Sequence, residues 1–406
     1  MPTEDRAIGE RVRVIRRRRG LSVEAAAGLA GIDKSFLSRL ERGERAFIRR
    51  GLLEDLARAL VCSVADLTGQ PYTLKDREST DVADAVSEIG RALYDTTLDD
   101  LPDTPARPLR ELVSGATLAH DNADEARYGP AGQGLADLLV ELQLQAATSG
   151  GEQRQAALIA LVEACKVAYI LAKRIGRIEL AGFVAERGRD AARVAERPDL
   201  IALMEMSRTS ALLAVGAHRR GRLVCAEALR DISAHAGPTR TDTAAAEARG
   251  MLHLTTALIA ARAGRGGDAD THLEEARSLA AHTGERNSMR YHFGPTNVAA
   301  WELGIAVESG TGPAVARRLS ATPIDLSVFN SKGRAAYVHF DLARAWAQAE
   351  GPHDDAVIRA LDAADRLAPV RTRNDPIARD LVVDLHRRAK RRVWELDSLR
   401  NRLGIA

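Results

Sequence analysis

Aromatic residues and cysteines are scarce in this chain of 406 residues. Aromatic side chains make up only 4%, so we expect an aliphatic core in which helices pack closely on small side chains. The three cysteines, Cys62, Cys165 and Cys225, lie far apart, and none belongs to a CxxC pair. This pattern argues against a disulfide framework and a cysteine-based zinc site, and it is typical of a reducing cytoplasm.

Membrane, export and enzyme signatures are missing as well. We find no apolar run near the roughly 18 residues that a membrane span needs, and the polar N-terminus lacks the apolar segment of a signal peptide. There is no GxGxxG, P-loop, HExxH or GxSxG motif, and the ten histidines are scattered. We therefore expect a cytoplasmic protein that is not an enzyme, uses no metal or cofactor and has no membrane partner. A hydrolase or transferase within residues 80–406 is the weakest alternative.

Charge is distributed unevenly along the chain, although the net charge is only +2. Residues 1–70 hold 14 Lys and Arg against 10 Asp and Glu, a net of +4, and the rest of the chain has a net of −2. A small basic module on a larger, near-neutral body suggests that the module binds a polyanion. An excess of four charges also arises by ordinary scatter, so charge alone does not decide this point.

Residues 1–70 predict five short helices. Apolar residues at helical spacing mark the first helix, which carries Ile8, Val12 and Ile15. The third helix is predicted from Lys34 to Arg42, and further helices follow at 51–60 and 64–67. Helix caps and stops are expected at polar and glycine residues, namely Gly20, Ser22, Gly31, Asp33, Gly43 and Ser63.

Two stretches of this segment, Leu21–Ile32 and Ser35–Gly43, resemble the Xre/Cro type of helix-turn-helix. The resemblance covers about residues 6–70 and includes apolar positions of the closing helices, such as Leu53, Leu56 and Leu67. Val23 stands where many members of that family carry Gln, which puts one phosphate contact or clamp in doubt.

The resemblance implies that the third helix enters the DNA major groove, where an α-helix fits. It places Lys34, Ser35 and Arg39 at base-reading positions and Ser38 at a phosphate or a base edge. Arg42, Arg45, Arg49 and Arg50 are then expected to hold phosphates. The alternative is that Arg39 and Arg42 form surface ion pairs with Glu41 or Glu44.

From about residue 155 onward, long helices alternate with short breaks. Glycines expected at the turn within each helical pair recur every 41–46 residues, at Gly176, Gly221, Gly264, Gly310 and Gly351. Small residues on both sides of each turn let paired helices approach, and stacked pairs form a solenoid. This body resembles tetratricopeptide-type repeats, best in the unit from His253 to Ala281, although its period exceeds 34 residues. A generic helical bundle is the alternative.

Within the body, residues 287–301 concentrate aromatics in a chain that has few. Gly294 and Pro295 are expected to start a helix there. Aromatic and amide side chains on the inner surface of a solenoid suit a bound peptide or small molecule. The candidate ligand-binding residues are Tyr291, Phe293, Asn297, Trp301 and Tyr337. Core packing is the competing interpretation for each of them.

The sequence therefore predicts an all-α protein with a five-helix helix-turn-helix domain at 1–70. A helical connector or degenerate repeat follows at 71–150, and tetratricopeptide-like repeats form 151–406. The last helix, from Pro376 to Leu403, is expected to cap the solenoid or to form a homodimer contact. We predict a sequence-specific DNA-binding transcriptional regulator whose repeats sense a small molecule or peptide and mediate homodimerisation. The alternative is a protein-interaction scaffold in which the DNA-binding head serves as a tether.

Overall fold

The computed structural model describes residues 7–72, 76–235 and 243–405. Apart from one isolated bridge between Thr97 and Asp100, every regular element in these ranges is helical. The predicted fold class, all-α with an N-terminal helix-turn-helix arrangement followed by helical repeats, is confirmed.

Five short helices form the N-terminal domain, close to the predicted bounds. They are α1 (Ile8–Arg18), α2 (Val23–Ala30), α3 (Lys34–Glu41), α4 (Arg50–Ala59) and α5 (Val64–Thr68). The Ser22 side chain accepts a hydrogen bond from the N–H of Ala25 at 3.0 Å, and Asp33 accepts one from the N–H of Ser35 at 2.7 Å. These caps begin α2 and α3 because they satisfy amide groups that have no partner within the helix.

Four helices connect this domain to the repeats and pack against the first long repeat helix. They are α6 (Arg77–Asp95), α7 (Leu109–Asp124), α8 (Tyr128–Gly132) and α9 (Leu135–Thr148). Their inward-facing residues belong to the same hydrophobic cluster as those of the first repeat helices, so they extend the stack of helices.

Ten helices then form five antiparallel pairs. The pairs are α10 (Gly151–Arg174) with α11 (Ile178–Val194), α12 (Pro198–Ala214) with α13 (His218–Ser233), α14 (Thr243–Arg262) with α15 (Gly266–Thr283), α16 (Pro295–Ser309) with α17 (Gly312–Ala321), and α18 (Lys332–Ala347) with α19 (Asp354–Leu367). A short 3₁₀ turn, η2 (Leu326–Phe329), precedes α18.

A glycine with positive φ lies between the two helices of every pair. Four of these positions were predicted, but the turn between α12 and α13 is at Gly216 (φ 83°). Gly221, which we expected there, lies within α13 and packs against Leu213. The prediction was wrong at this point because small residues occur on both sides of the turn, so spacing alone did not identify the residue with left-handed backbone.

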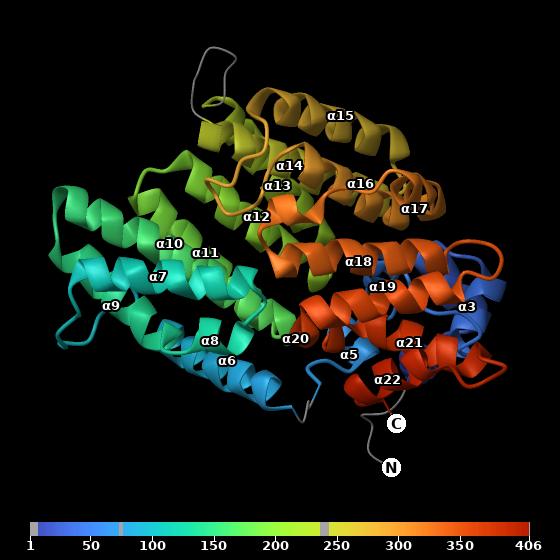
Figure 1. Cartoon of the computed structure of the whole chain (residues 1–406). Coiled ribbons are helices and arrows are strands. Elements are labelled where there is room, and N and C mark those ends of the chain that lie inside the picture. The colour runs from blue at the N-terminus through green and yellow to red at the C-terminus, as the bar shows by residue number, and fades with distance from the viewer. Residues whose placement is uncertain (1–6, 73–75, 236–242, 406) are drawn as a thin grey trace.

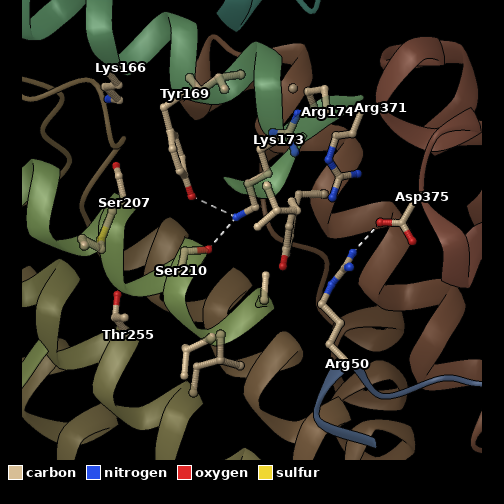
Figure 2. Close-up of a pocket in the computed structure, with 18 of the residues that line it drawn as sticks. Arg50, Lys166, Tyr169, Lys173, Arg174, Ser207, Ser210, Thr255, Arg371 and Asp375 are labelled. Carbon is tan, nitrogen blue, oxygen red and sulfur yellow. Dashed lines mark hydrogen bonds and ion pairs between the residues drawn. The ribbon is translucent and has the colours of Figure 1, made fainter. Parts of the chain in front are cut away.

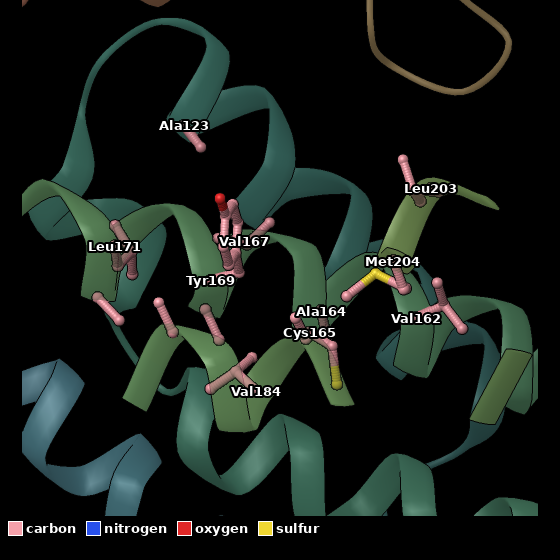
Figure 3. Packing of buried hydrophobic residues seen from close by; sticks show 14 of the residues in the cluster. Ala123, Val162, Ala164, Cys165, Val167, Tyr169, Leu171, Val184, Leu203 and Met204 are labelled. Atoms are coloured by element: carbon pink, nitrogen blue, oxygen red, sulfur yellow. The ribbon is translucent and has the colours of Figure 1, made fainter. Parts of the chain in front are cut away.

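The repeat helices approach closely through small side chains. Figure 3 shows part of the core around α10, where Cys165 and Met204 lie near one another. A Cβ atom added to Gly188 of α11 would lie only 2.9 Å from the Cβ of Cys165 and 2.7 Å from the Cε of Met204. Three successive helices therefore meet at a point where no larger residue than glycine fits.

Helix α10 also corrects an expectation about apolar runs. It is long and apolar enough to span a membrane by length and composition alone, although we saw no such run in the sequence. Within the structure, 72% of its most apolar stretch is buried, as in the central helix of a helical core.

The chain ends with α20 (Pro369–Arg373), α21 (Pro376–Arg388) and α22 (Trp394–Arg402). The single last helix that we expected from Pro376 to Leu403 is in fact two helices, with a break at 389–393. The stack of pairs curves round so that α18–α22 return to the N-terminal domain (Figure 1). One hydrophobic cluster joins the two parts, with Leu53 and Leu56 on one side and Phe340, Leu361 and Leu381 on the other. The predicted division into domains at residues 70 and 150 stays a prediction.

Candidate functional site

The outer face of α3 is open to solvent at its N-terminal end. Lys34 and Ser35 are exposed, and Ser38 and Arg39 are half-buried, whereas Leu37 and Leu40 are fully buried beneath them. Lys34 makes an ion pair with Glu24 at 3.1 Å in which both side chains are mostly exposed. Exposed pairs of this kind contribute about 0–1 kcal/mol, so a phosphate or a base edge can replace Glu24.

The surface ion pairs that we considered for Arg39 and Arg42 have different outcomes. Arg42 pairs with Glu44 at 2.5 Å and also donates a hydrogen bond to Ser38, as the surface-pair interpretation proposed. Glu41 is buried and binds Arg16 of α1, with the Arg16 Nε–Glu41 Oε1 distance at 2.5 Å, so it is not the partner of Arg39. The Nε of Arg39 has no partner among the described residues.

Arg45, Arg49 and Arg50 follow α3 but do not share one surface. Arg45 is exposed. Arg49 donates to the backbone oxygen of Glu308 at 3.3 Å, and Arg50 pairs with Asp375, so both contact the helical-repeat body. Arg49 and Arg50 therefore contact the body in this arrangement, and not the surface where we expected phosphate contacts. The reason is that α4 begins against the body, and the two side chains at its start are directed there.

A buried carboxylate holds the start of α4 against the body. Glu308 of α16 accepts hydrogen bonds from the N–H groups of Arg50 and Gly51, each at 3.1 Å. It also binds Arg344 of α18 at 2.5 Å, and Arg344 donates to the backbone oxygen of Ile48 at 2.7 Å. Burial raises the pKa of Glu308, but Arg344 and Arg262 outweigh that effect and hold its pKa at about 2. The charged carboxylate of Glu308 therefore connects α16 to α18 and to the start of α4 in the N-terminal domain.

Three further contacts connect the N-terminal domain to the C-terminal half of the chain. Glu54 of α4 binds Arg262 of α14 at 2.9 Å, and the Asp380 carboxylate accepts from the N–H of Phe47 at 2.7 Å. The Gln70 side chain donates to the backbone oxygen of Asn374 at 2.7 Å. The domain is thus attached along its length rather than by a single linker.

A cavity of about 390 Å³ lies inside the curve of the repeats. Helices α10, α12, α14, α16 and α18 contribute to its walls, and so do α4 and α5 of the N-terminal domain, through Arg50, Leu53, Glu54 and Val64. This volume falls within the range of about 300–1,000 Å³ that is usual for small-molecule sites. Because two helices of the helix-turn-helix domain line it, an occupant that fills the cavity would contact both parts of the protein.

Four of the five predicted ligand-binding residues, Tyr291, Asn297, Trp301 and Tyr337, line this cavity. Phe293 does not: it is fully buried in the neighbouring hydrophobic cluster, where its ring fills the space left by Gly250. The core-packing interpretation therefore describes Phe293. Asn297 is buried and bridges its neighbours, accepting from Arg334 at 2.7 Å and donating to the backbone oxygen of Tyr291 at 2.9 Å.

One end of the cavity has a balance of charges. Lys166 donates to the backbone oxygens of Met289 and Arg290 at 3.0 and 2.8 Å, and its ammonium lies 4.0 Å from the centre of the Tyr291 ring. Arg290 pairs with Asp121 and Glu163. Burial lowers the pKa of Lys166 to about 7. This end therefore anchors the loop that carries Tyr291.

The opposite end is strongly basic (Figure 2). Lys173 donates to Ser210 at 2.7 Å and to the hydroxyl of Tyr169 at 3.2 Å, both neutral partners. Arg371 is buried, and its Nε and one Nη have no hydrogen-bond partner in the described chain. Burial, assisted by the charge of Arg174, lowers the pKa of Lys173 to about 7 and the pKa of Arg371 to about 10.

Sequence reasoning missed this basic end. One signal was present: lysine is rare in the chain, with six in all, and two of them interrupt the apolar helix α10 seven residues apart, at Lys166 and Lys173. Residues seven apart lie on one face of an α-helix, so both lysines were to be expected on the same side of this helix, where they line the two ends of the cavity. No cluster of three or more His, Cys, Asp or Glu able to hold a metal ion occurs among the described residues.

Comparison with known proteins bears on the N-terminal domain. Residues 7–68 match the protein family described as "Helix-turn-helix domain". These residues form a helix-turn-helix domain. The match covers α1–α5 and supports a DNA-binding regulator.

No curated protein matches the sequence of the whole chain. Among solved structures it is similar to Bacillus thuringiensis PlcR, in a crystal structure of PlcR in complex with the peptide PapR7 and DNA. That alignment has 12% sequence identity and a TM-score of 0.28, and it covers 69% of this chain and 95% of PlcR.

Proposed function

We propose that the protein is a sequence-specific transcriptional regulator of the Xre type that responds to a small molecule or a peptide. In this proposal α3 reads DNA, the tetratricopeptide-like repeats hold the effector in the central cavity, and a homodimer binds a two-fold operator. Such a protein acts in the cytoplasm, where the DNA is. The observation that carries the proposal is that one cavity is walled by both the repeats and the helix-turn-helix domain.

The DNA-binding part rests on the exposed end of α3. Lys34, Ser35 and Arg39 occupy the face of α3 opposite Leu37 and Leu40, so they are available for base edges in the major groove. Arg42 and Arg45 flank that face and suit phosphates. Arg49 and Arg50 are assigned instead to communication between α4 and the body, on the strength of their contacts with Glu308 and Asp375.

The sensing part follows from the position of α4 and α5. An effector changes DNA affinity only if it binds two arrangements of the protein with different affinities. An occupant of the cavity contacts Arg50 and Glu54, the same residues that attach α4 to the body. Its binding therefore alters the orientation of the helix-turn-helix domain. In a dimer this also changes the distance between the two recognition helices, which must be about 34–36 Å for both to enter successive major grooves.

A salt titration with the full-length protein tests the proposal. We expect one preferred duplex, found by genome-wide mapping of bound sites, with affinity that falls by orders of magnitude between about 50 and 200 mM salt. Tyr337→Phe and Trp301→Leu should retain operator binding and lose the response to effector. Weak binding that ignores sequence would instead favour the scaffold, in which the repeats bind a partner protein and the head is a tether.

A further inference from the structure

We infer that the effector is a small organic anion whose carboxylate or phosphate group is bound by Lys173, Arg174 and Arg371 at the basic end of the cavity. This inference deepens the proposed function, on which it rests for the role of effector. The binding of the anion itself is a separate property that is measured without DNA.

The first argument is the charge balance around that end. Two of the cationic side chains around it have an acidic partner: Arg50 pairs with Asp375, and Arg262 pairs with Glu54. Within the described chain, no carboxylate lies within 4.0 Å of the side-chain nitrogens of the other four, which are Lys173, Arg174, Arg334 and Arg371. Cations that are shielded from water without a counter-ion are costly, and such perturbed groups cluster at functional sites.

The second argument is the number of hydrogen-bond donors without partners. Arg371 has two unpartnered nitrogens, and Arg174 and Arg334 have one each. The rings that surround them offer only their faces: the Arg371 guanidinium lies 4.5 Å from the centre of the Tyr337 ring, and that of Arg334 lies 5.3 Å from it. A carboxylate or a phosphate provides several acceptor oxygens at once and matches the fork of a guanidinium.

The third argument is that an anion fits the electrostatics of Lys173. Its described hydrogen-bond partners are the neutral hydroxyls of Ser210 and Tyr169, and burial lowers its pKa to about 7. The charged groups around it, Arg174, Arg50 and Arg262, are cations that favour the neutral amine, and Tyr337 acts in the opposite direction. A bound anion stabilises the ammonium form, so binding is accompanied by proton uptake near neutral pH.

The remainder of the cavity defines the rest of the ligand. Away from the basic end its wall includes apolar side chains such as Leu53, Met206, Leu213, Leu258 and Trp301. With a volume of about 390 Å³, it accommodates an apolar or aromatic skeleton rather than a long peptide. A free amino-acid or short-peptide carboxylate and a phosphate monoester share the chemistry that the basic end requires.

A matched pair of fluorescent probes tests the inference on the full-length protein. The anion 8-anilinonaphthalene-1-sulfonate and the neutral N-phenyl-1-naphthylamine have the same aromatic skeleton and differ in the sulfonate, which stands in for carboxylate or phosphate. We expect the anion to bind at least tenfold more tightly than the neutral compound. Equal affinities, or no binding of the anion, would overturn the inference.

Substitutions locate the site. Arg371→Gln and Lys173→Met should each weaken the anionic probe about tenfold and leave the neutral probe unchanged, whereas Arg110→Gln, on the exposed surface of α7, should alter neither. Because Lys173 lies in the cavity wall with only neutral hydrogen-bond partners, Lys173→Met should also raise the melting temperature of the ligand-free protein by about 2 °C or more. Unchanged probe affinity or a lower melting temperature in Lys173→Met would indicate a structural role and contradict the inference.

Competition distinguishes the two sources of the anion. Phenyl phosphate and phenylacetate should displace the bound sulfonate probe, and the stronger of the two identifies the natural headgroup. Displacement by neither would count against the inference. If the anion binds as predicted but leaves operator affinity unchanged, the proposed function fails while the anion site stands.

Discussion

The guanidinium of Arg50 at the start of α4 is paired with the carboxylate of Asp375, which also caps α21 by accepting from the N–H of Ile377 at 3.0 Å. Residues 325 positions apart thus join the helix-turn-helix domain to the last helices of the chain. Both side chains line the cavity. In the proposed mechanism, an anion bound beside them would compete with Asp375 for Arg50, and this competition would connect the effector directly to the DNA-binding domain.

Replacing Asp375 tests that competition. Asp375→Asn retains a good N-cap residue and removes the resident counter-ion of Arg50. We expect the affinity for the anionic probe to rise about three- to tenfold, while the free energy of unfolding falls by about 1–3 kcal/mol. Fluorescence titration and urea denaturation measure the two effects. A loss of anion affinity would show that Asp375 helps to bind the ligand rather than to compete with it.

Two arginines near α3 should differ in their effect on DNA binding. Arg39→Ala should relax discrimination at one base pair by about 1–3 kcal/mol. Arg45→Ala should weaken all duplexes alike and reduce the slope of log affinity against log salt by about 1. Fluorescence anisotropy with the preferred duplex and single-base variants separates the two behaviours. If both variants behave alike, the division between base and phosphate contacts is wrong.

Glu308 should be one of the most sensitive positions for stability. Glu308→Gln leaves Arg344 without its closest partner and weakens the capping of α4, so we expect a loss of about 3–5 kcal/mol in the free energy of unfolding. The matched control is Glu274→Gln on α15, whose exposed pair with Arg277 should contribute less than about 1 kcal/mol. Denaturant melts of both variants provide the comparison. Similar small losses would mean that the buried pair does not hold the domains together.

Phe293 and Tyr337 should separate packing from ligand binding. Phe293 is fully buried and lies outside the cavity wall, so Phe293→Ala should lower the free energy of unfolding by about 3–5 kcal/mol. Tyr337→Phe removes one hydroxyl at the cavity surface and should change stability by less than about 1 kcal/mol while altering probe affinity. The reverse ranking in thermal melts would assign Tyr337 to the core.

Asp380 should give the protein a pH-dependent stability. Burial and, to a smaller extent, the charge of Asp384 raise the pKa of Asp380 to about 7, although the N–H of Phe47 and the charge of Arg387 act in the opposite direction. Between about pH 4 and 7 the folded state holds a proton that the unfolded state has released, so stability falls as the pH rises through this window. Asp380→Asn should flatten that slope, by about 3 kcal/mol across the window, while its side-chain oxygen still accepts from Phe47. Melts at pH 5 and 7.5 that show the same slope in both proteins would contradict this pKa.

The N-terminal helices could be predicted closely because their signals are local. Ser22 and Asp33 cap the very helices that they precede in the sequence, and Leu37 and Leu40 are buried as their spacing indicated. The same reasoning misplaced one turn, at Gly221 instead of Gly216, and merged two helices after Pro376. The helical spacing of apolar residues continues through the turn at Gly216 and through the break at 389–393. Only the backbone conformation shows where each helix ends.

Sequence alone determined the local conformation of this protein: an all-helical chain, a basic helix-turn-helix head and a body of paired helices. Helix caps, apolar spacing and turn residues act over a few positions, so the sequence alone is enough to identify them. Tertiary structure alone decided that Arg50 faces Asp375, that Glu308 holds α4, and that Lys173, Arg174 and Arg371 share one cavity. These relationships join residues tens to hundreds of positions apart, and they arise only because the curved stack of helices returns to the domain from which it starts.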